Sequence, residues 1–443
     1  MKTSKRALLG GAAVAAVVAL ALTGCSGGQP ASSASGKTTI TWWAWDSNPV
    51  QKTMVAAFEK DNPNITVNIK NFTTGTSDYE NALRPALTSN NGPDVFQIAP
   101  GAMLTNYGPL AVDLTPYAEK AWGSDWKSKF YSTATSQLAL NGTQPALPTY
   151  MTAAGMIFYN SGLVKQLGIS VPTTVPQWIQ TCKKVNAAGL TCLAQGAKDA
   201  WVNEDVFISL ANSADPGYIY KAIDGKAKWS SPAMVSAMTA FQSLFTQGVA
   251  GKGATAMTQY PDAQNMFLSN KAVFIAQGTW NTPGTMTKTG IAGSQQGLST
   301  KINGVFLSAP FPGATADDQP TLPFGGVANG WGINAKSPNK DAAFKLIEFL
   351  SGGKGQTMIG TLASFPSLKS AKVSTSDLVD PSTQVPDVQR QQESLSKLVG
   401  IRNIPYPDLD AAVGQALSAV AAGTQSPKAA LSAIQTASDS ASR

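Results

Sequence analysis

The chain has 443 residues, of which only 13% are charged, and it contains no histidine. This length exceeds a single hydrophobic core and predicts two lobes, while the absence of histidine excludes Ser-His-Asp triads and histidine-bearing zinc sites. Without Lys2, Lys5 and Arg6 of the N-terminal leader, the net charge falls from +7 to +4, and no basic run interleaved with aromatic residues argues for nucleic acid as a partner.

Residues 1–25 are typical of a secretion signal. A basic start is followed by an apolar run from Ala7 to Leu22, which is short for a membrane span. The run ends in Leu22-Thr23-Gly24-Cys25, which resembles a bacterial lipobox, in which Cys25 is lipidated and becomes the mature N-terminus. The alternative is an ordinary signal peptide with a chance cysteine. The small, polar residues 26–36 are then a flexible tether.

The stretch from Thr38 to Ile69 predicts a strand, a helix and a second strand. Ile40 to Trp45 is rich in β-forming residues, and Asn48-Pro49 is typical of a helix start. Asn62-Pro63 ends that helix, and the next residues alternate between apolar and polar. A strand, a short crossover and a strand begin a parallel α/β sheet, whose ligands lie beyond the carboxyl ends of the strands. Trp42, Trp43, Trp45 and Asp46 lie in or just before that end, and we interpret them as the floor of a binding cleft.

The pattern continues as α/β to about residue 150. Gly92-Pro93-Asp94 precedes a short strand, Val95–Ala99, whose Gln97 is placed near the same cleft. A helix is expected from Leu114, and a strand from Ala154 to Tyr159. Tyr150 precedes that strand and is either a cleft wall or a hinge packing residue.

Two further cysteines, Cys182 and Cys192, are ten residues apart. An exported chain can oxidise them, and we favour a disulfide over two buried thiols.

Residues 200–280 are mostly helical by pattern. Trp201 to Asp205 opens one helix, and a second, after Ser230-Ser231-Pro232, carries a Met and Phe stripe that we interpret as core. A buried strand follows from Lys271 to Ile275 and leads to Gly278-Thr279-Trp280-Asn281. Further on, Ser337-Pro338 is expected to cap an amphipathic helix with Ala343, Leu346, Ile347 and Leu350 on one face.

The order of these elements resembles an extracellular solute-binding protein of an ABC importer, of the carbohydrate-binding kind related to maltose-binding protein. The resemblance covers nearly all of the chain after the leader. The segments that carry it are Phe58-Glu59-Lys60 to Val67, Gly92-Pro93-Asp94-Val95, Leu114-Thr115-Pro116, Phe158-Tyr159-Asn160, Asn270-Lys271 to Trp280, and Phe324-Gly325-Gly326 through Gly332-Ile333-Asn334 to Ser337-Pro338-Asn339-Lys340.

The resemblance implies an α/β fold of two lobes, each a mixed, mostly parallel sheet flanked by helices, with the ligand cleft between them. Hinge closure around the ligand is the expected motion. The expected lobes and hinges are the following: lobe one, 37–152 plus 279–364; lobe two, 153–278 plus 365–443; hinges near Thr152, Gly278 and Phe365.

Two residues match positions that contact sugar in the maltose binder: Asp46, the acid after the first strand, and Trp280, the stacking tryptophan after the crossing strand. Other positions depart from that pattern. The tryptophan and the acid after the Gly-Pro-Asp strand correspond to Ile98 and Gly101, the acid of the first hinge strand to Ala153, and the C-terminal aromatic pair to Leu409 and Asp410. We therefore expect a sugar other than maltose.

A pyranose presents an apolar face and a rim of hydroxyls, so its site needs flat aromatic rings together with amides and a few carboxylates in fixed positions. Glycines 325 and 326 are expected to let backbone N–H groups approach the ligand. The candidate ligand-binding residues are Trp280, Asp46, Trp45, Trp201, Trp331, Trp43, Gly325, Gly326, Gln97, Asn203, Glu204, Asn281 and Tyr150.

The predicted function is a lipid-anchored receptor on the outer face of the bacterial cell membrane. It would be a monomer that captures a mono- or oligosaccharide and delivers it to an ABC permease, without a cofactor, a metal or chemistry of its own. The alternatives are a secreted carbohydrate-active enzyme with two cleft carboxylates and a receptor of the same fold for another solute. No Gly-x-Ser-x-Gly elbow, P-loop or Gly-x-Gly-x-x-Gly fingerprint supports an enzyme.

Overall fold

The computed structural model describes residues 36–442, except 46–49, 73–75, 90 and 295–303. Asp46 and Cys25, two residues of the sequence predictions, lie outside the described residues. Residues Thr38–Arg443 pack as one unit. Within the described ranges, none of the helices combines the length and apolar character needed to cross a membrane.

The first lobe contains a five-stranded mixed sheet in the order β2-β1-β3-β11-β4. β1 pairs in parallel with β2 and β3, and β11 is antiparallel to β3 and β4. The helix α1, Gln51–Asp61, connects β1 to β2 as predicted and ends at Asn62, whose N–H donates to Phe58 O at 2.9 Å. The strands are β1 (Thr38–Ala44), β2 (Ile65–Asn71), β3 (Val95–Ile98), β4 (Leu147–Pro148) and β11 (Gly330–Ile333).

The second lobe contains a four-stranded sheet in the order β7-β8-β6-β9. β7 and β8 are parallel, and β6 is antiparallel to both β8 and β9. The strands are β6 (Met156–Asn160), β7 (Thr191–Ala194), β8 (Ala272–Gln277) and β9 (Phe306–Pro310). The prediction that 279–364 belongs to lobe one needs a correction here. After β8 the chain returns through α12 and α13, and β9 pairs with β6 over the whole of both strands.

A three-stranded antiparallel sheet, β10-β5-β12, contains two of the three expected hinges. It consists of β5 (Tyr150–Ala154), β10 (Phe324–Val327) and β12 (Phe365–Pro366), so Thr152 and Phe365 lie in it. The third, Gly278, follows β8 and lies against Ala153 of β5. The single strand predicted from Ala154 to Tyr159 is two strands, because Gly155 adopts a φ of +85° and separates β5 from β6.

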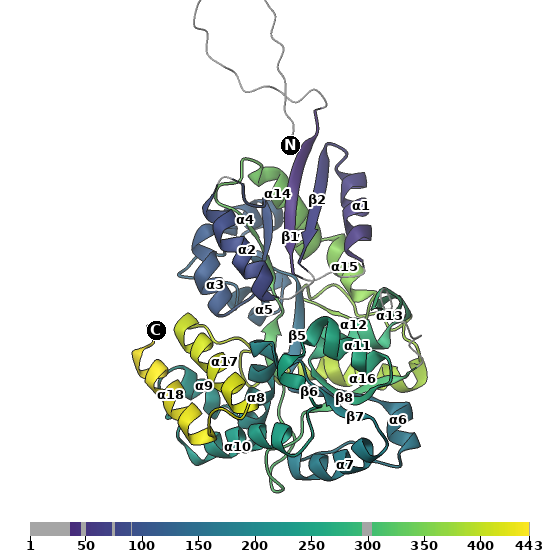
Figure 1. The fold of residues 1–443 in the computed structure, drawn as a ribbon. Coiled ribbons are helices and arrows are strands. Elements are labelled where there is room, and N and C mark those ends of the chain that lie inside the picture. Colours follow the sequence, from purple (N-terminus) through teal and green to yellow (C-terminus); the bar gives the residue numbers. More distant parts are fainter. Residues whose placement is uncertain (1–35, 46–49, 73–75, 90, 295–303, 443) are drawn as a thin grey trace, which may run out of the picture. The chain divides into compact units, whose positions relative to one another are not determined.

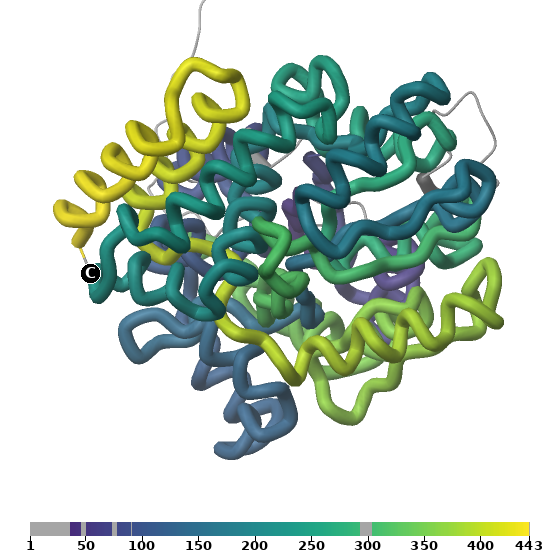
Figure 2. Tube along the Cα trace, turned by 90° about the horizontal axis from the view of Figure 1, so that it is seen from below, coloured from purple at the N-terminus to yellow at the C-terminus, as the bar shows by residue number. Residues whose placement is uncertain are grey.

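Helices surround both sheets (Figure 1). In lobe one they are α2 (Thr76–Thr88), α3 (Ala102–Tyr107), α4 (Thr115–Trp122), α5 (Ser132–Ser136), α14 (Lys340–Ile347) and α15 (Lys354–Gly360). In lobe two they are α6 (Ser161–Gln166), α7 (Val175–Ala187), α8 (Ala200–Ala214), α9 (Tyr218–Ile223), α10 (Pro232–Thr246), α11 (Gln264–Leu268), α12 (Thr282–Met286), α13 (Lys288–Ser294), α16 (Pro381–Ser394), α17 (Pro407–Ala421) and α18 (Pro427–Ser440). In Figures 1 and 2 the yellow α17 and α18 lie beside the teal α8 and α10, against which they pack.

Local sequence signals explain several of these helices. Ser231 caps α10 by accepting the Met234 N–H at 3.3 Å, and the Met and Phe stripe of this helix is buried in the lobe-two core. The predicted apolar face of α14 is also buried, but the helix begins at Lys340 after Asn339 and receives no side-chain cap. Ser337 instead accepts the Asn339 N–H, at 3.0 Å, just before the helix.

Cys182 on α7 and Cys192 on β7 form a disulfide in the structure. Both are fully buried, and their Cα atoms are 5.2 Å apart. The bond ties a covering helix to the edge strand of the lobe-two sheet.

Candidate functional site

Two predicted site residues, Trp201 and Trp280, come together at one edge of the lobe-two sheet. Trp201 lies in the first turn of α8, which follows β7, and Trp280 follows β8. Because β7 and β8 are parallel, their carboxyl ends meet at the same edge. The two indole rings are partly exposed, and their centroids are 6.2 Å apart at an interplanar angle of 68°.

Tyr260 and Gln277 complete this aromatic cluster, and the sequence analysis missed both. Tyr260 lies nearly parallel to Trp201, with centroids 6.3 Å apart and planes inclined by 14°. Gln277 Oε1 accepts hydrogen bonds from Trp280 Nε1 at 2.8 Å and from the Tyr260 hydroxyl at 3.2 Å. Burial raises the pKa of Tyr260 to about 12, so its hydroxyl keeps its proton at neutral pH. One buried amide at the end of β8 therefore fixes two aromatic rings. From here on, the aromatic cluster means Trp201, Tyr260, Gln277 and Trp280.

Arg402 lies against this aromatic cluster, in the loop before α17. Its guanidinium carbon is 4.1 Å from the centroid of Trp280 and 5.2 Å from that of Trp201. It also donates to both carboxylate oxygens of Asp205, with Nε–Oδ1 at 2.9 Å and Nη2–Oδ2 at 2.8 Å. Burial acts to lower the pKa of Arg402, but the Asp205 charge and hydrogen bonds outweigh burial and raise it.

Burial raises the pKa of several carboxyl groups on α8, α17 and α2, including Asp205, where the Arg402 charge acts in the opposite direction. Burial raises the pKa of Glu204 on α8 well above its ordinary range, and the charges of Asp410 and Asp205 add to this effect. Burial, followed by the charge of Glu80, raises the pKa of Asp410 on α17 to about 7. Burial also raises the pKa of Glu80 on α2. Protonated carboxyls of this kind both donate and accept hydrogen bonds.

Four buried amide side chains follow the carboxyl ends of the lobe-two strands. Each has at least one polar atom without a hydrogen-bond partner among the described residues: both amide atoms of Gln195, Asn203 Oδ1, Gln277 Nε2 and Asn281 Nδ2. Leaving such an atom unpaired costs about 1–3 kcal/mol, so these positions favour a ligand hydroxyl or an ordered water. Asn203 and Asn281 are predicted site residues. The other two amides were missed because they lie at the ends of apolar strands.

Trp45 and Gln97 hold each other in lobe one. The side-chain Oε1 of Gln97 accepts a hydrogen bond from the backbone N–H of Trp45 at 3.0 Å. The backbone carbonyl of Gln97 accepts one from the Tyr79 hydroxyl at 2.6 Å. The Trp45 ring meets Tyr79 edge-on at 5.3 Å and is only partly buried. Gln97 is fully buried, and its hydrogen bond fixes the backbone of Trp45. The Trp45 indole lies just beyond β1 and stays partly exposed.

Trp43 and Trp331 have surroundings that differ from a cleft wall. Trp43 packs with Phe72 at 5.3 Å, and Lys70 Nζ lies 4.2 Å from its ring centroid. Trp331 is 7% exposed and meets Trp42 edge-on at 4.8 Å. Because β11 is an inner strand between β3 and β4, Trp331 is packed into the core of lobe one rather than placed at a strand end.

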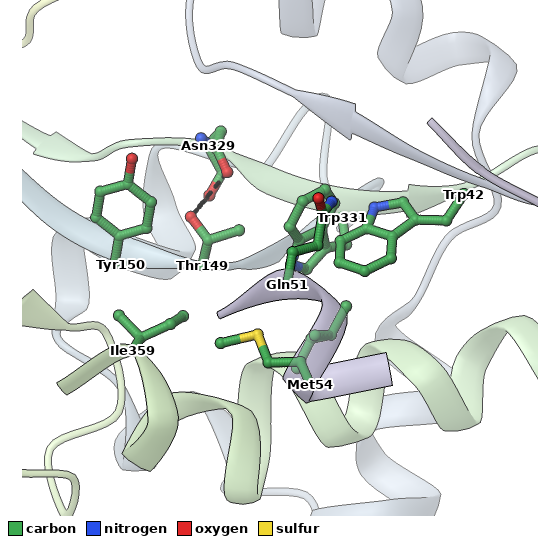
Figure 3. Close-up of a pocket in the computed structure, with 9 residues that line it drawn as sticks. Trp42, Gln51, Met54, Thr149, Tyr150, Asn329, Trp331 and Ile359 are labelled. Atoms are coloured by element: carbon green, nitrogen blue, oxygen red, sulfur yellow. Dashed lines mark hydrogen bonds between the residues drawn. The ribbon is translucent and has the colours of Figure 1, made fainter. Parts of the chain in front are cut away.

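A small cavity adjoins this packed tryptophan pair (Figure 3). Its volume is about 30 Å³, which accommodates a water molecule but not a sugar ring. Tyr150, a predicted site residue, is partly exposed and lines it on the β5 side. The lining residues are Trp42, Gln51, Met54, Thr149, Tyr150, Asn329, Trp331, Leu350 and Ile359.

Gly325 and Gly326 are needed for close backbone packing and do not present free N–H groups to a ligand. The Gly325 N–H donates to Gly400 O at 2.8 Å, and its carbonyl accepts Gln137 Nε2 at 2.9 Å. Their φ angles are +145° and +141°. A Cβ on Gly325 would lie 2.5 Å from Thr152 O, and one on Gly326 would lie 2.1 Å from Gln137 Oε1. Glycine is required here by close approach of β10 to β5 and Gln137.

The described residues contain no group of three or more Cys, Asp or Glu side chains arranged to hold a metal ion. The chemical character of the site is therefore set by aromatic rings, amides, carboxyls and one arginine.

Residues 44–357 match the family of bacterial extracellular solute-binding proteins. The chain belongs to this family. It is 26% identical to an ABC transporter extracellular-binding protein of Pyrococcus horikoshii over 53% of this chain, and it spans only 55% of that relative's length. It is 23% identical to the multiple sugar-binding protein of Streptococcus mutans, over 76% of this chain and 77% of that protein.

The fold is also that of solved binding proteins. Maltose-bound MalE3 of T. maritima aligns with a TM-score of 0.73 at 20% identity, over 90% of this chain and 99% of that one. The predicted two-lobed binding-protein fold is thus confirmed.

Proposed function

We propose that this family member is the substrate-binding lipoprotein of an ABC importer, and that it captures an extracellular sugar or oligosaccharide between its lobes. The aromatic cluster at the carboxyl ends of β7 and β8 is the observation that carries this proposal, because it combines partly exposed rings with buried, unpaired amides. The multiple sugar-binding protein of Streptococcus mutans and maltose-bound MalE3, to which this chain is similar, support a carbohydrate ligand.

The chemistry of the aromatic cluster suits a pyranose. Aromatic rings match the apolar C–H face, and an aromatic contact is worth about 0.5–1.5 kcal/mol beyond the burial of area. Hydroxyl groups taken out of water need partners, and amides with unpaired N–H and C=O atoms, such as those of Asn203 and Asn281, supply both kinds. Burial raises the pKa of Glu204, which favours the uncharged form of this carboxyl beside a neutral sugar.

Capture proceeds in this proposal by closure of the two lobes about the β10-β5-β12 sheet and Gly278. Trp45 contributes from lobe one and the aromatic cluster from lobe two, so a bound sugar gains contacts on both sides only when the lobes close. Asp46, beyond the described residues, is proposed as the lobe-one acid that bonds hydroxyl groups.

We further propose that Cys25 is lipidated and holds a monomer at the outer face of the cell membrane, where it delivers sugar to the permease subunits. In this proposal the protein performs no chemistry on its ligand. Wild-type protein should incorporate labelled palmitate in cells, and Cys25→Ala should not. Equal labelling of the variant and the wild type would contradict the anchor.

A thermal-shift screen of neutral mono- and oligosaccharides, followed by calorimetry and chromatography of the sugar, tests the sugar proposal. A ligand that binds only the native state raises the melting temperature by mass action. We expect at least one sugar to raise the melting temperature and to be recovered intact. Hydrolysis of the sugar would instead favour a carbohydrate-active enzyme, and a response confined to other solutes would favour a different receptor.

A further inference from the structure

Arg402 is a largely buried cation that lies directly against the aromatic cluster. It comes from a part of the chain remote from β7 and β8, yet its guanidinium lies over Trp280 and beside Trp201. Only about a fifth of its side chain is exposed (21%), so most of the cationic group has left water. A cation over an indole face is attracted by the ring, and more strongly when it is desolvated.

The backbone on both sides of Arg402 is fixed. The Val399 N–H donates to Pro323 O at 3.0 Å, and Gly400 O accepts the Gly325 N–H of β10 at 2.8 Å. On the other side, Ile404 O accepts the Ala102 N–H of α3 at 2.8 Å. The fold therefore fixes the backbone that carries the Arg402 side chain, and this restricts the positions that the guanidinium can adopt over Trp280.

Asp205 cancels the charge of Arg402. The pair shares three N–H···O contacts of 2.8–3.1 Å, in the bidentate geometry that lysine cannot form. Tyr260 and Tyr150 also act on Arg402, and burial raises the pKa of Glu204, the residue next to Asp205. Arg402 thus presents a flat, neutralised surface instead of a free cation.

Arg402 also closes a ring of contacts through the aromatic cluster. Asp205 lies on the same first turns of α8 as Trp201, and Trp201 faces Tyr260. Tyr260 and Trp280 share Gln277, and Trp280 returns to Arg402. Gln277 holds Trp280 only through the indole N–H, whereas Arg402 covers a face of the ring. Removal of the guanidinium would therefore leave that face of the indole without a packing contact.

We propose that Arg402 is a specificity-determining positioning residue of the sugar site. It holds Trp280 in place, and because Asp205 cancels its charge, the site selects neutral sugars and does not bind uronic acids through a free guanidinium. This inference rests on the proposed function and adds to it the class of sugar.

Calorimetric titrations test the inference with three neutral probes, maltotriose, xylotriose and N-acetylated chitotriose, and one acidic probe, trigalacturonic acid. We expect the wild-type protein to bind a neutral probe and not the acid. Arg402→Met should weaken that binding about 10-fold, and Arg402→Lys, which keeps the cation but loses the bidentate pair, should recover part of the loss. Asp205→Asn should shift the acid-to-neutral affinity ratio about 10-fold toward trigalacturonic acid, because it leaves the guanidinium charge uncancelled.

Arg390→Met provides the matched control. Arg390 donates to the buried Asp387 at 2.6 Å in a second arginine–aspartate pair, which joins α16 to β9 and contains no aromatic ring. Its affinity for the neutral probe should equal that of the wild type. Circular dichroism and melting curves separate misfolding from a lost contact, and if Arg402→Met does not fold, the Asp205→Asn ratio decides.

The outcomes are distinct. Unchanged affinity in Arg402→Met together with an unchanged ratio in Asp205→Asn would overturn the role of Arg402 while leaving a sugar receptor. Wild-type protein that binds only trigalacturonic acid would overturn the selectivity for neutral sugars. Wild-type protein that binds none of the probes and no sugar of the thermal-shift screen would remove the proposed function, and this inference with it.

Discussion

Exposure and position together distinguish the tryptophans of this chain, because Trp43 and Trp122 are also partly exposed but pack against Phe72 and Phe130 within lobe one. Trp42, Trp126, Trp178 and Trp229 are fully buried, and each packs within a lobe core. Trp45, Trp201 and Trp280 are partly exposed and follow strands or open helices at strand ends. Burying an indole entirely inside a core needs no ligand, whereas an indole held half-exposed by fixed hydrogen bonds is preorganised for one.

Replacement of Trp280 with alanine tests that distinction. Because Trp280 contributes a partly exposed ring in contact with Arg402 and Trp201, we expect sugar affinity to fall at least about 10-fold with the fold intact. Calorimetry on the best sugar of the screen measures it. Trp122→Ala is the control, since Trp122 is partly buried among Trp126 and Phe130 of lobe one. Equal affinity in Trp280→Ala and wild type would show that Trp280 is a packing residue.

Asp410 predicts a pH dependence of stability. Its pKa of about 7 in the folded protein lies above the ordinary value of about 4, so the folded protein keeps a proton that the unfolded chain has lost. The free energy of unfolding should therefore be highest near pH 4 and fall, by roughly 2–4 kcal/mol, as the pH rises to about 7. Burial raises the pKa of Glu204 and Glu80, which act in the same direction.

Chemical denaturation of wild type and Asp410→Asn at pH 5 and pH 8 measures this dependence. The variant removes both the titrating group and its charge beside Glu204, so it should lose most of the difference between the two pH values. A wild-type protein that is more stable at pH 8 than at pH 5 would contradict the raised pKa of Asp410.

Sequence reasoning found the ring-bearing residues of the site better than the residues that hold them. Trp280 could be predicted because it follows a recognisable strand and matches the stacking tryptophan of the maltose binder, and Trp201 because it opens a helix with a clear local signal. Tyr260, Gln277 and Arg402 could not, because their positions depend on tertiary contacts between segments that no local pattern connects. Trp331 was predicted as a ligand contact, but it lies on an inner strand of the first sheet and is packed into the core, which depends on strand pairing that no local pattern reveals.

Among the secondary-structure elements, β10 approaches β5 so closely that it needs a glycine at position 325. Gly325→Ala places a Cβ 2.5 Å from Thr152 O at a φ of +145°. We expect a loss of at least about 2 kcal/mol in the free energy of unfolding, from strain and overpacking together. Gly142→Ala is the control: it has a φ of +82° but open space around its Cβ position, so it should cost only about 1 kcal/mol. Equal losses in denaturant titrations would show that close approach is not the cause.

The disulfide between α7 and β7 should stabilise lobe two without touching the sugar site. It closes a loop with a sequence separation of 10, and both sulfurs lie in the core behind the sheet. We expect Cys182→Ser with Cys192→Ser to lower the free energy of unfolding by roughly 2–4 kcal/mol and to leave sugar affinity unchanged. Denaturant unfolding and calorimetry on the same preparation measure both, and a matching loss of affinity would place the disulfide in the binding mechanism.

The elements that could be predicted are those with strong local signals. The first strand–helix–strand unit, the capped α10 and the buried face of α14 all follow from periodicity and capping residues. Local sequence patterns could not predict that β5 and β6 are separate strands or that β9 belongs to the second sheet. The split depends on one positive φ at Gly155, and the pairing of β9 with β6 depends on a return of the chain through α12 and α13.

For the whole molecule, the order of elements and the family agree on two lobes joined by crossing strands. Each sheet places strand ends and helix starts where a cleft needs them, with Trp45 fixed by Gln97 in lobe one and the aromatic cluster fixed by Gln277 and Arg402 in lobe two. These contacts fix the orientation of the side chains that we propose as ligand contacts. Burial raises the pKa of the nearby carboxyl groups of Glu204, Asp410 and Glu80, which favours their uncharged forms.

Isothermal titration calorimetry of the purified protein with neutral oligosaccharides, with the sugar recovered and analysed afterwards, decides whether this chain is a sugar receptor. We expect saturable binding of one sugar per chain, tighter than about 10 μM, with the sugar returned intact. Absence of heat with every neutral sugar, or recovery of shortened products, would contradict it.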